Sequence, residues 1–147
     1  MSFDVTFWCP NGVALDLGGL HNFLVCDERV NGVDPFDDEE FIATIGIGGE
    51  SWSEFSVENA EELYGDDPEF SVGPVGTVST GARFEMSYST PQPVVDETFK
   101  FVVEVAARFS WVIVDEQVGT DFAADLDGLR RSWEQSRGLA RGVLGHH

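Results

Sequence analysis

Basic residues are scarce in this chain of 147 residues, in which 27 Asp and Glu outnumber 8 Lys and Arg and give a formal net charge of −19. That charge argues against a protein whose general surface holds nucleic acid or anionic lipid, because both of these carry negative charge themselves. Cysteine is scarce as well. Cys9 and Cys26 are too few for a disulfide framework and lack the spacing of metal ligands. We therefore expect no direct binding of nucleic acid, no membrane surface as a partner and no disulfide framework.

Long hydrophobic runs are also lacking. The longest nearly apolar stretch, residues 99–114, is interrupted by Lys100, Glu104 and Arg108, so it predicts a helix followed by a strand and not a membrane span. The residues before Asp4 contain neither the basic region nor the apolar region of a signal peptide. We therefore expect a cytoplasmic protein.

Aromatic and aliphatic residues, by contrast, are plentiful. Hydrophobic residues make up 42% of the chain, which contains 12 Phe and 4 Trp, whereas disordered acidic tails are poor in aromatic residues. A chain of this length usually forms one domain and buries enough surface to fold without a metal or a disulfide. The sequence therefore predicts one folded domain, and we expect no cofactor.

Alternating and helical patterns of apolar residues predict a mixture of strands and helices. Strands are predicted at 3–8, 41–47, 70–72, 75–78, 83–89 and 111–114, of which 70–72 and 75–78 are interpreted as an edge strand interrupted by glycine. Helices are predicted at 57–64 with Ser56 as its cap, at 95–109 and at 125–143. Two segments stay open: 13–33, which has short apolar runs at 13–15 and 23–26 with two glycines between them, and the acidic segment 34–40, which either starts a helix or forms a loop.

These elements predict an α+β fold in a single domain, with an antiparallel or mixed sheet and helices packed mainly on one face. We divide the chain into an acidic α+β domain at 1–124 and a C-terminal amphipathic helix at 125–147. That helix carries arginines and packs on the domain or is appended to it.

Acidic residues are concentrated in the amino-terminal part of the chain. Residues 1–82 contain 17 acids and a single base, Arg29, which gives a net charge of −16. Residues 129–147 contain one acid and four arginines, a net charge of +3. The acids either keep the protein in solution or attract a basic partner, and the opposite charges also favour docking of the last helix on the acidic body of its own chain.

Catalytic and metal-binding motifs are incomplete in this sequence. Residues 49–53 resemble a Gly-x-Ser-x-Gly nucleophile elbow with serine in place of the last glycine, and the only later histidines are the two at the end of the chain. Residues 125–128 and Glu134 match part of a calcium-binding loop but supply too few carboxylates. The acidic run 37–40 is more typical of a solvated segment, and His21 has no motif around it. We therefore predict no metal ligands and no catalytic residues.

Two segments resemble a group of small bacterial proteins. Residues 1–8, Met-Ser-Phe-Asp-Val-Thr-Phe-Trp, resemble the Ser-Tyr-Asp-x-x-Phe-Trp-like strand with which those proteins open. Residues 101–122 resemble their helix–strand segment, which closes on an Asp-Pro-Gln-like turn. Phe3 replaces the usual tyrosine, and Glu116 replaces the proline of that turn. Those proteins are largely uncharacterised, and some resemble immunity proteins encoded beside polymorphic toxins, so the resemblance implies an inhibitor of a toxin.

The charge distribution and this resemblance together predict a non-enzymatic acidic protein-binding module, an immunity or inhibitor protein that masks a basic surface of a toxin. Its acids would steer the encounter with the partner, and its aromatic residues would supply affinity. The predicted partner-binding residues are Asp34, Asp37, Asp38, Glu39, Glu40, Glu50, Trp52, Glu54, Glu61, Glu62, Asp66 and Asp67.

Two alternative functions stay open. An acidic mimic of nucleic acid would inhibit a DNA-binding protein and would carry its carboxylates in rows along an elongated surface. A small enzyme would use carboxylates such as Asp115, Glu116 or Asp127, in a pocket that raises their pKa values. Adjacent residues of a strand point to opposite faces, which counts against Asp115 and Glu116 acting as a pair.

Overall fold

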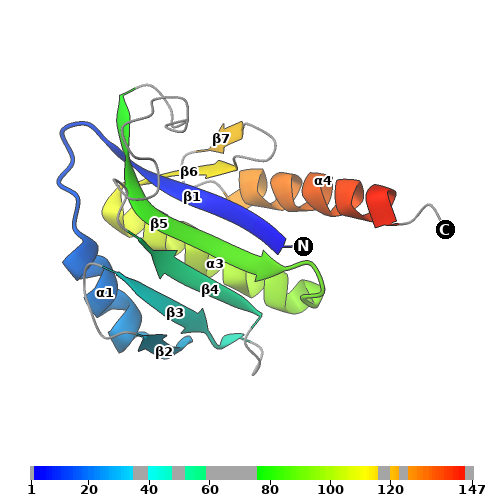
Figure 1. Cartoon of the computed structure of the whole chain (residues 1–147), viewed down its shortest axis with the longest axis horizontal. Helices are drawn as coiled ribbons and strands as arrows, with labels where there is room; N and C mark the ends of the chain where they lie inside the picture. Colours follow the sequence, from blue (N-terminus) through cyan, green and yellow to red (C-terminus); the bar gives the residue numbers. More distant parts are fainter. Residues whose placement is uncertain are drawn as a thin grey trace.

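One antiparallel sheet and three helices make up the part of the chain that the computed structural model describes, residues 2–34, 40–47, 52–58, 76–115, 120–122 and 126–144. The strands of this part are β1 Ser2–Pro10, β2 Val30–Asp34, β3 Phe41–Ile45, β4 Ser53–Val57, β5 Thr77–Ser87, β6 Val112–Asp115 and β7 Thr120–Phe122. Its helices are α1 Leu17–Cys26, α3 Gln92–Phe109 and α4 Leu126–Leu144 (Figure 1).

The strands lie in the order β2-β3-β4-β5-β1-β6-β7, and each neighbouring pair is antiparallel. The first strand of the chain therefore lies inside the sheet, where it pairs with β5 on one side and β6 on the other. Figure 1 shows α1 and α3 on the same side of the sheet. The predicted single-domain α+β fold is confirmed, and the sheet is antiparallel at every described pairing.

Alternation along β1 explains why the helices occupy that side. Phe3, Val5 and Phe7 are fully buried and belong to the hydrophobic core. The ring of Phe3 contacts Phe99 of α3 at a centroid distance of 5.6 Å and Trp133 of α4 at 5.5 Å. Residues two apart in a strand point to the same face, so one side of β1 meets both helices. The arginine-bearing last helix is thus held on the sheet by a buried tryptophan.

The fourth strand corrects one prediction. Residues 56 and 57, expected as the cap and first residue of a helix, belong to β4, in which Ser53, Phe55 and Val57 are buried and alternate with more exposed residues. This period of two fits β4 between β3 and β5, where Phe55 lies 5.4 Å from Phe84 of β5. The rest of the predicted helix, from residue 59 onward, lies outside the described residues.

A second correction concerns the predicted edge strand. Thr77 and Val78 open β5, and β5 lies between β4 and β1 in the interior of the sheet. The glycines before and within this strand, Gly76 and Gly81, both have positive φ angles, 82° and 75°. Glycine adopts that conformation without steric cost, so these residues shape a long inner strand instead of marking an edge. The predicted strand at 70–72 lies outside the described residues.

The ambiguous segment 13–33 contains α1 followed by β2. Asp16 caps α1, and its side chain accepts a hydrogen bond from the backbone N–H of Gly19 at 2.8 Å. Such a cap supplies a partner for an amide that the helix itself leaves unpaired. The two glycines at 18 and 19 lie in its first turn, and Leu20 and Leu24 bury its inner face.

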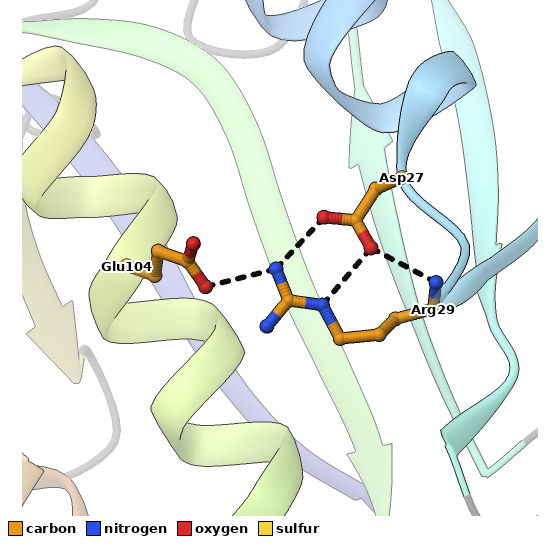
Figure 2. A network of polar contacts seen from close by, with 3 residues as sticks. All are labelled: Asp27, Arg29 and Glu104. Atoms are coloured by element: carbon orange, nitrogen blue, oxygen red, sulfur yellow. Dashed lines mark hydrogen bonds and ion pairs between the residues drawn. The ribbon is translucent and has the colours of Figure 1, made fainter.

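Arg29, the single base among residues 1–82, ties the turn after α1 to α3 (Figure 2). Its guanidinium donates to both carboxylate oxygens of Asp27, at 2.9 and 2.7 Å, and also reaches Glu104 of α3 at 2.8 Å. The guanidinium carbon lies 4.4 Å from the ring centroid of Phe101. The hydrogen bonds from Arg29 lower the pKa of Asp27 below its ordinary value of 3.8, and the same bonds raise the pKa of Arg29.

We predict that Arg29→Met, which keeps the aliphatic stem and removes the charge, lowers the free energy of unfolding by roughly 1–2 kcal/mol at neutral pH. Asp27 titrates at lower pH in the folded chain, so its contribution is complete above 3.8 and is lost as the pH falls through the lowered pKa. Urea unfolding from neutral pH to about pH 3 should therefore show the difference between wild type and variant shrinking.

Lys100→Met is the matched control, because Lys100 forms an exposed ion pair with Glu97 on α3. It should change stability by less than about 0.5 kcal/mol. Equal losses in the two variants would contradict a structural role for the Arg29 network.

Candidate functional site

The face of the sheet opposite the helices carries a line of three carboxylates. Asp4 of β1 lies directly opposite Glu85 of β5, and Glu85 lies directly opposite Glu54 of β4. Residues paired in this way have Cβ atoms about 4.5–5.5 Å apart and point to the same face. The alternation of β1 and β4 places Asp4 and Glu54 on the side away from Phe3 and Phe55, which are buried in the core. We call Asp4, Glu54 and Glu85 the acidic row.

One base stands beside the acidic row. The Nη2 atom of Arg83, on the same strand as Glu85, lies 3.5 Å from Asp4 Oδ1 and 3.4 Å from Glu85 Oε1. The Ser2 hydroxyl lies 2.8 Å from Glu85 Oε1 and 3.1 Å from Asp4 Oδ1. In the part of the chain described by the structure, no ion pair reaches Glu54. Three acids and one base leave this cluster with a formal charge of −2.

Burial and neighbouring charges raise the pKa values of Asp4 and Glu54. Partial burial raises the pKa of Asp4 above 3.8, and the charge of Glu85 adds to the effect, while Arg83 opposes it. Partial burial likewise raises the pKa of Glu54 above 4.5, with further contributions from the charge of Glu85 and a side-chain hydrogen bond with it. Burial is the largest cause of both shifts, the charge of Glu85 adds to each, and the charge of Arg83 opposes each.

The acidic row is accessible to solvent near the start of β1. The side chains of Asp4, Glu85 and Arg83 are 27%, 36% and 49% exposed. Toward the other end of β1, by contrast, Thr6 and Trp8 are buried on this same face, and the Trp8 indole N–H donates to the Thr6 hydroxyl at 2.9 Å. A partner that contacts the face therefore meets the acidic row.

Four of the predicted partner-binding residues are described by the structure. Glu54 belongs to the acidic row. Trp52, partly exposed, directly precedes β4, and its carbonyl oxygen accepts a hydrogen bond from the backbone N–H of Ser87 at 3.1 Å. Asp34 is exposed at the end of the edge strand β2, and Glu40 is exposed just before β3. The structure therefore places Trp52 and Glu54 near each other, with Asp34 two strands away from β4. The other predicted residues, Asp37, Asp38, Glu39, Glu50, Glu61, Glu62, Asp66 and Asp67, lie outside the described residues.

Sequence reasoning missed Asp4, Arg83 and Glu85 as parts of a site. A signal was present, because Asp4 and Glu85 occupy polar positions of strands predicted correctly from their alternation. What the pattern did not contain was the pairing of β1 with β5 and of β5 with β4. Only that pairing brings acids from distant segments into one line.

The carboxylates considered for an enzyme lie in unlike surroundings. Asp115, at the end of β6, is fully buried and accepts a hydrogen bond from the Ser132 hydroxyl of α4. Asp127, in the first turn of α4, has a side chain that is 77% exposed and lies 3.9 Å from Arg130. Glu116 lies outside the described residues. Asp115 thus belongs to the contact between sheet and helix, whereas Asp127 faces solvent.

The remaining candidates have structural surroundings. His21 is buried in α1, with its ring 5.2 Å from that of Phe41 in an edge-to-face arrangement. Among the described residues, no three His, Cys, Asp or Glu side chains are placed to hold a metal ion. Among the described residues, the acidic row is therefore the candidate site.

Comparisons with protein-family models, with curated proteins and with solved structures found no match for this chain. None of the helices within the described ranges combines the length and the apolar character of a membrane-spanning segment.

We predict that Glu54→Gln stabilises the protein at neutral pH by roughly 0.2–1 kcal/mol, because it removes a like charge directly opposite Glu85. The folded chain binds the Glu54 proton more tightly than the unfolded chain, so ionisation of Glu54 costs stability as the pH rises through a window that begins near 4.5. The advantage of the variant should therefore vanish as the pH falls below that value, as measured by thermal unfolding across this range.

Glu58→Gln, at an exposed position just after β4, is the control for this experiment. It makes the same chemical change without an opposing carboxylate in the described ladder. A stabilisation as large as that of Glu54→Gln would show that general charge reduction, and not the acidic row, is responsible.

Proposed function

We propose that this chain is a non-enzymatic acidic protein-binding module of the immunity or inhibitor type, which acts in the cytoplasm by covering a basic surface of a toxin-like protein. The observation that carries the proposal is the acidic row, three carboxylates aligned across β1, β5 and β4 on the face that the helices leave open. A surface of this charge attracts a basic partner and repels nucleic acid.

Electrostatic complementarity acts mainly on the rate and specificity of association. The excess of acids over bases, −19 over the whole chain, adds long-range attraction that the local cluster alone would not provide. Affinity then requires contacts that exclude water, and Trp52 beside the row offers an aromatic surface of the kind enriched in binding hot spots.

The basic residues of the last helix support this orientation of the binding face. Arg130 of α4 lies 3.4 Å from Asp96 of α3, and Trp133 anchors the same helix in the core. Arg130 is thus engaged by α3 on the helical side of the sheet. The acidic row, on the opposite side, stays available to a partner.

We expect a genomic neighbour of this protein to encode a toxin-like basic protein, and co-expression of the two to protect cells that the neighbour alone would kill. The triple variant Asp4→Asn, Glu54→Gln, Glu85→Gln should slow association by about tenfold or more at low salt, as measured by surface plasmon resonance. The rate for the wild-type protein should fall steeply as salt is added, because screening weakens the attraction.

A control triple variant, Glu28→Gln, Glu97→Gln, Glu134→Gln, changes the net charge by the same amount at exposed positions away from the row. It should associate within about threefold of the wild-type rate. The function proposed here fails if the wild-type protein neither binds nor protects against any neighbouring gene product. Binding to a DNA-binding protein, reversed by added DNA, would instead favour a mimic of nucleic acid.

A further inference from the structure

The acidic row contains two facing pairs, Asp4 with Glu85 and Glu54 with Glu85, and the second pair has no arginine that bridges both of its carboxylates in the described part of the chain. The Nη2 atom of Arg83 forms ion pairs with Asp4 Oδ1 at 3.5 Å and with Glu85 Oε1 at 3.4 Å. On the other side of Glu85, the facing carboxyl of Glu54 has a side-chain hydrogen bond with Glu85 and is attracted by the charge of Arg83, but it has no ion pair in the described ranges of the chain. Two facing carboxylates repel unless a proton or a cation lies between them.

The carboxylate pair is accessible to solvent and has an aromatic and two hydroxyl residues beside it on the ladder. Glu85 is one-third exposed and Glu54 partly exposed, so both carboxylates can be reached from solvent. Trp52 lies opposite Ser87, one residue pair along the ladder in which Ser53 faces Met86 and Glu54 faces Glu85. Ser87 in turn pairs with Ser2 of β1. An aromatic residue and two hydroxyl residues therefore border the carboxylate pair.

We propose that the open face of the sheet captures an arginine side chain from a basic protein partner, with the guanidinium held between the carboxylates of Glu54 and Glu85 beside Trp52. This inference rests on the proposed function and specifies which surface of the module is used and which side chain of the partner it recognises. It commits the face to a protein occupant of positive charge.

Arginine fits this position better than lysine. The guanidinium is planar and has five N–H donors, so one group reaches carboxylates on two adjacent strands, whereas an ammonium is a compact point charge. Arginine also stacks on aromatic rings, and indole is the best partner for such a contact. The chain already uses this chemistry elsewhere: Arg29 binds two carboxylates while lying over Phe101.

A second copy of the chain is a poorer occupant. Two copies placed face to face would bring acidic row against acidic row, and like charges across an interface are repulsive. The acids that make the face attractive to a basic partner therefore act against self-association through it.

The test titrates the isotope-labelled full chain with the peptide acetyl-Gly-Arg-Gly-amide, followed by amide chemical shifts. We expect the largest shifts at residues 52–55 and 83–87, and weaker binding of acetyl-Gly-Lys-Gly-amide. Glu54→Gln should weaken binding of the arginine peptide by about tenfold, the effect of one charged hydrogen bond. Trp52→Leu should reduce the preference for arginine over lysine.

Glu97→Gln, on the outer surface of α3, is the control for loss of one exposed negative charge and should leave the affinity within about twofold. Equal weakening by Glu97→Gln and Glu54→Gln, or shifts spread over all acidic residues, would overturn the proposed site. Concentration-dependent shifts at the same amides without peptide would overturn it in favour of a second copy. Thermal unfolding of each variant verifies that the fold is intact.

The two proposals fail separately. If the chain protects against a neighbouring toxin and Glu54→Gln protects equally well at limiting dose, the arginine site is wrong and the immunity function stands. If the peptide maps to Glu54 and Glu85 while no neighbour is bound, the cation site stands and the immunity function is wrong.

Discussion

The alternation of β1 between a core face and an opposite face is the constraint on which the rest of this structure depends. Phe3, Val5 and Phe7 are fully buried on one side, where the aromatic rings of α3 and α4 meet them. Because strand residues alternate between faces, the intervening positions must lie on the other side of the sheet. Helices cover the first side, so polar residues such as Asp4 can occupy the second. The core thus decides where the acids of the inner strands are displayed.

Repulsion between the carboxylates of the acidic row lowers the stability of the sheet at this place. Opposite charges or hydroxyls at the positions of Glu54, Glu85 and Asp4 would favour strand pairing, whereas like charges directly opposite each other disfavour it. The apolar face behind them tolerates this cost, since Phe55, Phe84 and Phe7 form a contiguous aromatic cluster with centroid distances of 5.3 and 5.4 Å. Local arrangements that oppose folding and survive on a rigid scaffold are expected at functional surfaces more than elsewhere.

The sequence predicted an element well where its apolar pattern repeats over many residues, and failed where the pattern covers only a few. The helix at 95–109 and the strand at 83–89 rest on several turns or alternations, and the structure contains both as α3 and β5. β4 has only five residues, and a glutamate-rich segment follows it, so helical propensity concealed its alternation. The acidic row depends on which strands are neighbours, and that information lies in tertiary packing. Glu54 could therefore be chosen from charge alone, whereas Asp4 and Glu85 could not.

The positions of the few bases show which acids they neutralise. Arg29 lies between Asp27 and Glu104, Arg83 between Asp4 and Glu85, and Arg130 between Asp96 and Asp127, so each of these arginines serves two acids. Each such cluster keeps an excess of negative charge, and no base within the described residues forms an ion pair with Glu54. Three of the few bases thus contact two acids each, and the negative charge left on the face that carries Glu54 is the charge on which the proposed binding of a cationic surface rests.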